Sequence, residues 1–114
     1  MRACLCLIIL TVWHSSSAFG ADTFPKFTEK VIDANIGKVC YAVTVADVDS
    51  DGKQDIVAVS ENRVLWYQAP DWKMRVIIQD QTPRDNVCIA AHDIDGDGKI
   101  DFALGAGWTG TGTI

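Results

Sequence analysis

Residues 47–55 read DVDSDGKQD, and residues 93–101 read DIDGDGKID. Both stretches follow the pattern D-x-D-x-D-G-x-x-D, and the second begins 46 positions after the first. Self-similarity at a fixed period of about 20–50 residues is typical of stacked supersecondary units. The two stretches therefore predict a repeat, and we call them the first and the second Asp loop.

Each Asp loop concentrates four carboxylates within nine residues. Two such charges about 4 Å apart repel by about 4 kcal/mol at an effective dielectric constant of about 20, and a bound cation removes this cost. Ca²⁺ takes about 6–8 oxygen ligands, whereas Mg²⁺ keeps several waters and zinc prefers His or Cys. We therefore expect one Ca²⁺ in each loop, two in all. The expected ligands are the side chains of positions 1, 3, 5 and 9 and the carbonyl of position 7, namely Asp47, Asp49, Asp51, Lys53, Asp55, Asp93, Asp95, Asp97, Lys99 and Asp101.

The alternative to a metal site is a pair of solvated acidic hairpin turns, because Asp-Gly is itself a common turn. Two complete copies at a fixed spacing favour the metal. An EF-hand is disfavoured because it needs Glu at position 12, where this chain has Ala58 and Leu104. The nonapeptides of calcium-binding β-helices are also missing from the sequence.

Short runs of strand-forming residues, separated by turn formers, surround the first loop. Small residues such as Ala42 and Ala46 in the first run suit an innermost, crowded strand, and the bulky Trp66 and Tyr67 fall in the third run. Four short strands in a unit of about 46 residues predict a propeller blade. The expected fold is therefore all-β, a β-propeller fragment of about two four-stranded blades with each Asp loop between the first and second strands. The expected strands around and after the first loop are 41–46, 55–60, 63–68 and 75–79.

These strand-flanked loops, with Gly-Lys after the third Asp, resemble the FG-GAP/VCBS repeat family, whose calcium-loop blades also occur in integrin α-chains. The resemblance covers about residues 24–108, although the Phe-Gly…Gly-Ala-Pro element is only echoed by LGAGW at 104–108. It implies that the metal is structural and holds the hairpin. Residues 85–99 and 105–108 are also similar to propellers attached to aldos-2-ulose dehydratase-type sugar enzymes, which would imply sugar dehydration or isomerisation.

The first twenty residues have the layout of a secretory signal peptide. Arg2 precedes an uncharged apolar run at 3–13, and Ala18 and Gly20 are spaced for cleavage before Ala21. An apolar run of 11 residues is shorter than the roughly 20 that span a bilayer. We therefore expect residues 1–20 to be removed, no stable membrane span to remain, and the protein to be secreted, periplasmic or extracellular.

The expected mature region, 21–114, holds unit 1 at about 25–70 and an incomplete unit 2 at about 71–114. The repeat extends upstream of the loops, because residues 26–33 resemble residues 72–79. Since a closed propeller has at least about four blades, two units do not close a ring. We expect the remaining blades to come from sequence beyond the C-terminus or from other copies.

Cys40 and Cys88 remain after signal cleavage, in the similar contexts VCYAV and VCIAA. In an exported chain these two cysteines could form one disulfide. Like positions of neighbouring units seldom approach within the roughly 4.4–6.8 Å between Cα atoms that a disulfide needs. The favoured prediction is two small, buried apolar side chains.

Charge and composition restrict the function classes. The net charge is −5, and eight of the fifteen acidic residues lie in the Asp loops. The sequence has no stripe of basic residues, and this argues against a nucleic-acid partner. We expect no catalytic residue in this chain: His92 is predicted to pack at a strand end, and core or edge packing is favoured over sugar stacking for the aromatic residues. These are Trp66, Tyr67, Trp72 and Trp108.

The leading prediction is a secreted calcium-binding scaffold or ligand-binding module, with an extracellular carbohydrate or protein as its ligand. A subdomain of a sugar dehydratase or isomerase and an adhesion module are the alternatives. The sequence does not decide between enzyme and non-enzyme for the whole protein, and it favours a non-enzymatic role for this chain.

Overall fold

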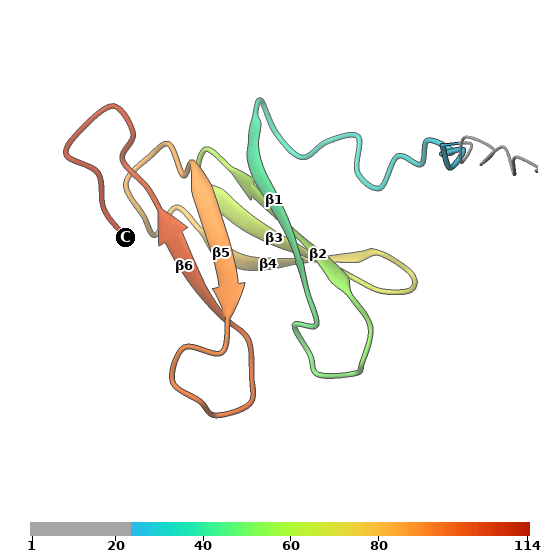
Figure 1. Ribbon diagram of the computed structural model, residues 1–114. Coiled ribbons are helices and arrows are strands. Elements are labelled where there is room, and N and C mark those ends of the chain that lie inside the picture. The colour runs from blue at the N-terminus through green and yellow to red at the C-terminus, as the bar shows by residue number, and fades with distance from the viewer. Residues whose placement is uncertain (1–23) are drawn as a thin grey trace, which may run out of the picture.

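The computed structural model describes residues 24–114 and contains six strands and no helix in that range (Figure 1). The predicted signal peptide, 1–20, lies outside the described residues. Within them, no helix is long and apolar enough to cross a lipid bilayer. The strands are β1 (Cys40–Ala46), β2 (Asp55–Ser60), β3 (Arg63–Gln68), β4 (Lys73–Gln79), β5 (Cys88–His92) and β6 (Asp101–Gly105).

The strands form two antiparallel sheets in chain order. The first sheet has the order β1-β2-β3-β4, and the second pairs β5 with β6. This is the predicted arrangement of one complete blade followed by the first two strands of another, so the all-β propeller fragment is confirmed. Because β4 belongs to the first sheet, unit 1 from here on means the sheet β1–β4, and unit 2 means β5 and β6. The β2 and β3 bounds match the prediction, whereas β4 begins at Lys73, two residues earlier than expected.

The two hairpins that carry the Asp loops have the same register. Ala46 pairs with Asp55 at the mouth of the first loop, and His92 pairs with Asp101 at the mouth of the second. Figure 1 shows both loops at the same end of the two sheets. The repeat in sequence is therefore a repeat in structure.

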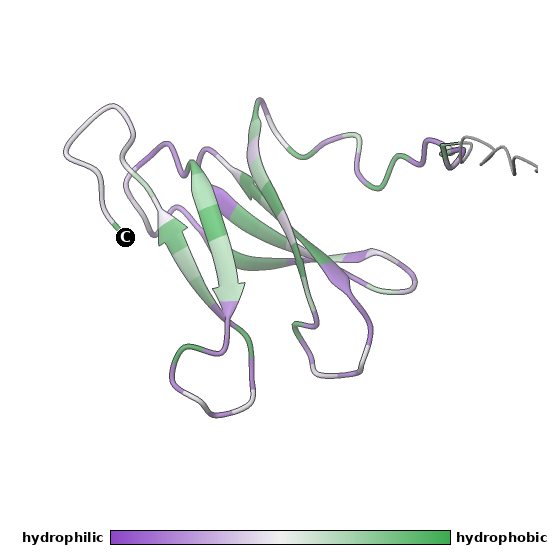
Figure 2. Cartoon of the chain, in the orientation of Figure 1, coloured by the Kyte–Doolittle hydropathy of each residue, from purple (hydrophilic) through white to green (hydrophobic). Residues whose placement is uncertain are grey.

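The first sheet is apolar on both faces, and Figure 2 shows the hydrophobic residues following the strands. One face carries Val57, Val59 and Val64, and the unit 2 residues that pack against it are Ile89, Phe102 and Leu104. We call it the unit-2 face. The other face carries Ala58, Leu65 and Tyr67, and we call it the opposite face. β2 contributes side chains to both faces and is mostly buried, as its uninterrupted apolar sequence predicts.

The segment before β1 covers part of the opposite face. Ile32 and Ile36 pack against its buried residues. The hydroxyl of Tyr67 donates a 2.6 Å hydrogen bond to Asp33, and the guanidinium of Arg63 donates one of 2.6 Å to the carbonyl of Ile36. These polar contacts hold the segment against the sheet at two points.

Two burial predictions were wrong. Cys40 and Cys88 are free thiols and both are exposed, and His92 is exposed as well. In β5 the side chains alternate, so Ile89 turns toward unit 1 while Cys88 and His92 turn to the side that no described residue covers. Cys40 is the first residue of β1 and precedes an irregularity in its pairing with β2.

Candidate metal centres

The first Asp loop wraps around the carboxylate of Asp47. This residue follows the end of β1, and its two oxygens accept N–H groups from Asp51 at 2.9 Å and from Gly52 at 2.8 Å. Gly52 has a φ of 84°, and Gly98 has a φ of 85° at the equivalent position. Glycine suits this sharp reversal because it reaches positive φ without a side-chain clash.

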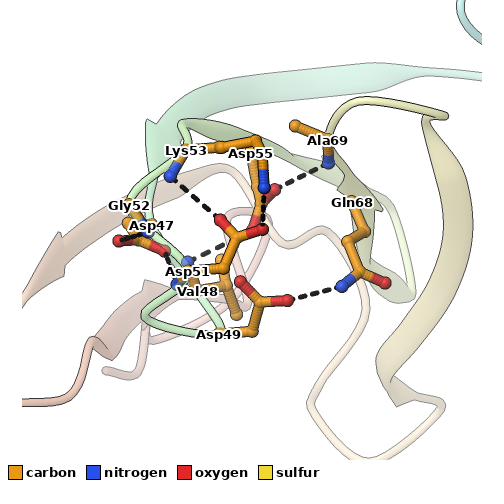
Figure 3. Close-up of polar contacts among 9 residues, drawn as sticks. All are labelled: Asp47, Val48, Asp49, Asp51, Gly52, Lys53, Asp55, Gln68 and Ala69. Atoms are coloured by element: carbon orange, nitrogen blue, oxygen red, sulfur yellow. Dashed lines mark hydrogen bonds and ion pairs between the residues drawn. The ribbon is translucent and has the colours of Figure 1, made fainter.

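Asp55 connects the first loop to the outer half of the sheet (Figure 3). It opens β2 and is only 1% exposed. One carboxylate oxygen accepts the N–H of Val48 at 3.2 Å, and the other accepts the N–H of Ala69, in the β3–β4 turn, at 2.8 Å. A buried charge needs such partners, and here they are backbone N–H groups that follow β1 and β3, the two strands that flank β2.

Asp49 has a second connection to the outer strands. The amide of Gln68, the last residue of β3, donates a hydrogen bond to its carboxylate. The carbonyl oxygen of Gln68 in turn accepts two hydrogen bonds from Arg75 of β4, at 3.1 and 2.8 Å. This chain orients the Asp49 side chain from outside the loop.

Three of the predicted side-chain ligands come together in the first loop. One carboxylate oxygen from each of Asp47, Asp49 and Asp55 lies within 4.8 Å of the others. Asp51 instead pairs with the ammonium of Lys53, whose hydrogen bond lowers the pKa of this carboxyl. Asp51 is therefore outside the cluster, and the Lys53 carbonyl stays a predicted ligand.

The second loop repeats this arrangement. Asp93 accepts N–H groups from Gly96 at 2.7 Å and from Gly98 at 2.9 Å, and Asp101 accepts the N–H of Ile94 at 3.0 Å. Oxygens of Asp93, Asp95 and Asp101 lie within 4.8 Å of one another.

The fourth carboxylate of the second loop, that of Asp97, is again outside the cluster. Asp97 pairs with Lys99 at 3.1 Å, as Asp51 pairs with Lys53. Every member of the first cluster thus has its counterpart 46 residues later. The Lys99 carbonyl stays a predicted ligand, like that of Lys53.

The donor set of each cluster fits a hard divalent cation. Three carboxylates this close repel one another, and the lysine of each loop is already paired with another Asp. Oxygen donors without His or Cys suit Ca²⁺ more than zinc. The residues that would hold an ion are the two carboxylate trios, and an ion bound there would brace the hairpin, because each trio lies between the first two strands of its unit.

The contacts of Gln68 and Ala69 with the first loop were not predicted from the sequence. They lie 19 and 14 residues from their aspartate partners, on a different strand and turn. The only signal was the position of both residues just before the Pro70 turn. The counterpart of Gln68 at an offset of 46 is Ile114, which has no side-chain amide to donate such a hydrogen bond.

The aromatic residues mostly pack as predicted. Tyr67 is 2% exposed, Trp72 packs against the opposite face, and Trp66 lies under the guanidinium of Arg75 at 5.2 Å. Trp108 differs, because it is 66% exposed and meets Tyr41 edge-on at 6.0 Å.

Repeated antiparallel sheets, each with an acidic cluster between its first two strands, define a β-propeller-type module. The family model of the FG-GAP-like repeat matches residues 47–104, which is just over half of the chain and includes both Asp loops. The chain therefore belongs to the FG-GAP-like repeat family. Comparison with curated proteins and with solved structures gave no significant match.

Proposed function

We propose that this chain is a secreted propeller module in which each Asp loop binds one structural Ca²⁺. The observation that carries the proposal is the pair of matching carboxylate trios, each with oxygens within 4.8 Å and each at the mouth of an equivalent hairpin. The module serves as a scaffold or as a ligand-binding domain for an extracellular carbohydrate or protein.

A structural role for the ion follows from where the carboxylates are attached. Asp47 follows β1 and Asp55 begins β2, so an ion between them ties the two strands together. Binding to the folded state alone adds RT ln(1 + [Ca²⁺]/Kd) to stability. With a Kd of about 10⁻⁴–10⁻³ M, as in extracellular modules, about 1 mM Ca²⁺ contributes about 0.4–1.4 kcal/mol per site. Export, which the N-terminal residues predict, would expose the protein to such concentrations.

Thermal melting of the full chain in Ca²⁺ and in chelator tests the proposal. Two sites should raise the melting temperature by about 3–20 °C at about 1 mM Ca²⁺, since about 1 kcal/mol corresponds to about 4–8 °C in a domain of this size. Mg²⁺ at the same concentration is the control and should raise it less. An unchanged melting temperature from chelator to several millimolar Ca²⁺ would contradict the proposal.

The exposed Trp108 supports a ligand-binding role and suggests where to test it. Its ring lines a hollow of about 570 Å³ together with Val87, Ala106 and the residues at 110–114. An exposed indole beside a hollow is suited to stacking on a sugar ring. A glycan array probed with the full chain and with Trp108→Ala tests this role. Binding that the substitution abolishes supports it, and binding that is unchanged in the variant places the ligand elsewhere.

A further inference from the structure

Unit 2 packs on unit 1 through one of its faces. The corresponding face of unit 1, 46 positions earlier in the sequence, is not covered by another sheet of the described residues. Ile89, Phe102 and Leu104 are the residues with which unit 2 packs on unit 1. Their counterparts 46 positions earlier are Val43, Ile56 and Ala58. The pairing of β1 with β2 places all three on the opposite face of unit 1. That face is therefore, by position in the repeat, the side on which a further unit would pack.

Two hollows in the structure confirm this equivalence. The hollow between the segment before β1 and the opposite face has five apolar lining residues with counterparts in the second hollow: Val31, Ile32, Val43, Ile56 and Ala58. Their counterparts 46 positions later all line the hollow between β4 and unit 2: Ile77, Ile78, Ile89, Phe102 and Leu104.

The segment before β1 therefore lies against unit 1 as the end of β4 lies against unit 2. It takes the position of an outer strand of a preceding unit, in agreement with the resemblance of residues 26–33 to residues 72–79. The described residues provide no further strands for such a unit.

The two edge strands of the opposite face carry exposed apolar side chains, whereas the centre of this face is covered by the segment before β1. Val43 and Val45 are each 60% exposed on β1, and Met74 and Val76 are 46% and 47% exposed on β4. Cross-strand pairing places these side chains on the same side as Ala58, Leu65 and Tyr67. Exposed apolar side chains grouped along a strand in this way are typical of an interaction site.

The chain also carries the complementary surface. On unit 1, Ala42 packs on the side that faces unit 2, and the counterpart of Ala42 is Cys88. Cys88 and Ala90 are exposed on the uncovered side of β5 and are small, as close packing of a neighbouring sheet requires. The uncovered face of unit 2 therefore corresponds to the face of unit 1 on which unit 2 packs.

We propose that the opposite face of unit 1 binds the uncovered face of unit 2 of a second copy of this chain. The contact repeats, head to tail, the step that relates the two units within one chain. Such heterologous contacts close into a ring or continue as a filament. The proposal rests on the packing of the sheets and is independent of metal binding.

Light scattering coupled to size exclusion tests the proposal on the full chain in Ca²⁺. The wild type should associate in a concentration-dependent way. Val45→Lys, on the opposite face, and Ala90→Lys, on the uncovered face of unit 2, should each weaken association at least tenfold. Both side chains are exposed, so the melting temperature of each monomer should stay near that of the wild type.

Mixing the two variants makes the test specific for a head-to-tail contact. The Val45→Lys copy keeps an intact unit 2 face, and the Ala90→Lys copy keeps an intact opposite face, so the mixture should form a 1:1 dimer. A monomeric wild type overturns the proposal. Unaffected association of Ala90→Lys, or failure of the mixture to dimerise, also overturns it.

Cysteine cross-linking provides a measurement that does not depend on charged substitutions. In a background with Ser at the other cysteines (Cys4, Cys6 and Cys40), Val43→Cys should form intermolecular disulfides with the native Cys88 under mild oxidation. Asp71→Cys, exposed in the β3–β4 turn, is the matched control and should not. Equal cross-linking of both variants overturns the proposed contact.

Discussion

Asp55 combines two roles at a single position. It is a member of the first carboxylate trio, and it is also a buried acceptor for two backbone N–H groups, those of Val48 and Ala69. Asp101 is its counterpart but is only half-buried and accepts the N–H of Ile94. The two positions are alike in sequence and differ in what surrounds them.

This difference predicts unequal effects of the same substitution. In Asp55→Asn one carboxylate oxygen becomes an N–H donor and leaves a backbone donor unpaired, which should lower the free energy of unfolding by about 1–3 kcal/mol. Asp101→Asn is the matched control and should cost less. Urea unfolding in chelator measures both effects without a contribution from metal. Equal losses in the two variants would contradict the role given to the Ala69 contact.

Tyr67 provides a prediction about alkaline pH. Burial, and then its hydrogen bond to Asp33, raise the pKa of Tyr67 above its ordinary value near 10. Above about pH 10 the unfolded chain loses this proton while the folded chain keeps it, so stability falls as pH rises, by up to about 1.4 kcal/mol per pH unit.

Tyr67→Phe isolates this contribution. Its free energy of unfolding should fall less steeply than that of the wild type between about pH 9 and about pH 11, because this ionisation is absent. Denaturant titrations at several pH values measure the two slopes. Parallel slopes would show that Tyr67 does not keep its proton as described.

At the scale of the element, the hairpin with its Asp loop is the unit that the sequence predicts best. Turn formers bracket β2 and β3, and their β-branched and aromatic residues favour strands, so both bounds were predicted. The sequence predicted ligands at loop positions 1, 3, 5 and 9, and the structure brings the carboxylates of positions 1, 3 and 9 together in both units while position 5 pairs with a lysine.

Contacts distant in sequence could not be predicted in this way. The Tyr67–Asp33 hydrogen bond spans 34 residues, and the Gln68–Asp49 hydrogen bond spans 19. The exposure of Cys88 and His92 depends on which side of β5 another sheet covers. Periodicity predicts the alternation of side chains along a strand, but it does not say what lies beyond each face.

The loops are predicted to bind their ions independently. Asp49→Ala should remove the site in the first loop, and Asp95→Ala the site in the second, because each deletes one member of a different trio. Calorimetric titration with Ca²⁺ should then report one ion in either variant and two in the wild type. Asp71→Ala, an exposed acidic residue outside the loops, is the control and should keep two. A variant at position 49 or 95 that still binds two ions would contradict this assignment.

At the scale of the whole molecule, the two units pack through apolar side chains while both acidic loops project from the same end (Figure 1). The packing faces and the metal clusters are thus separate surfaces of one repeat. Burial of the shared apolar interface relates the units to each other, and an ion in each loop would stiffen the hairpin of its own unit. The same 46-residue step accounts for the hairpins, the clusters and the two equivalent hollows.

Terbium titration tests the central claim most directly, because a lanthanide occupies calcium sites and reports occupancy by its luminescence. We predict saturation at two Tb³⁺ per chain, displacement by Ca²⁺, and loss of the signal in a variant with both Asp49→Ala and Asp95→Ala. Absence of saturable luminescence, or the same titration curve in the double variant, would contradict the account.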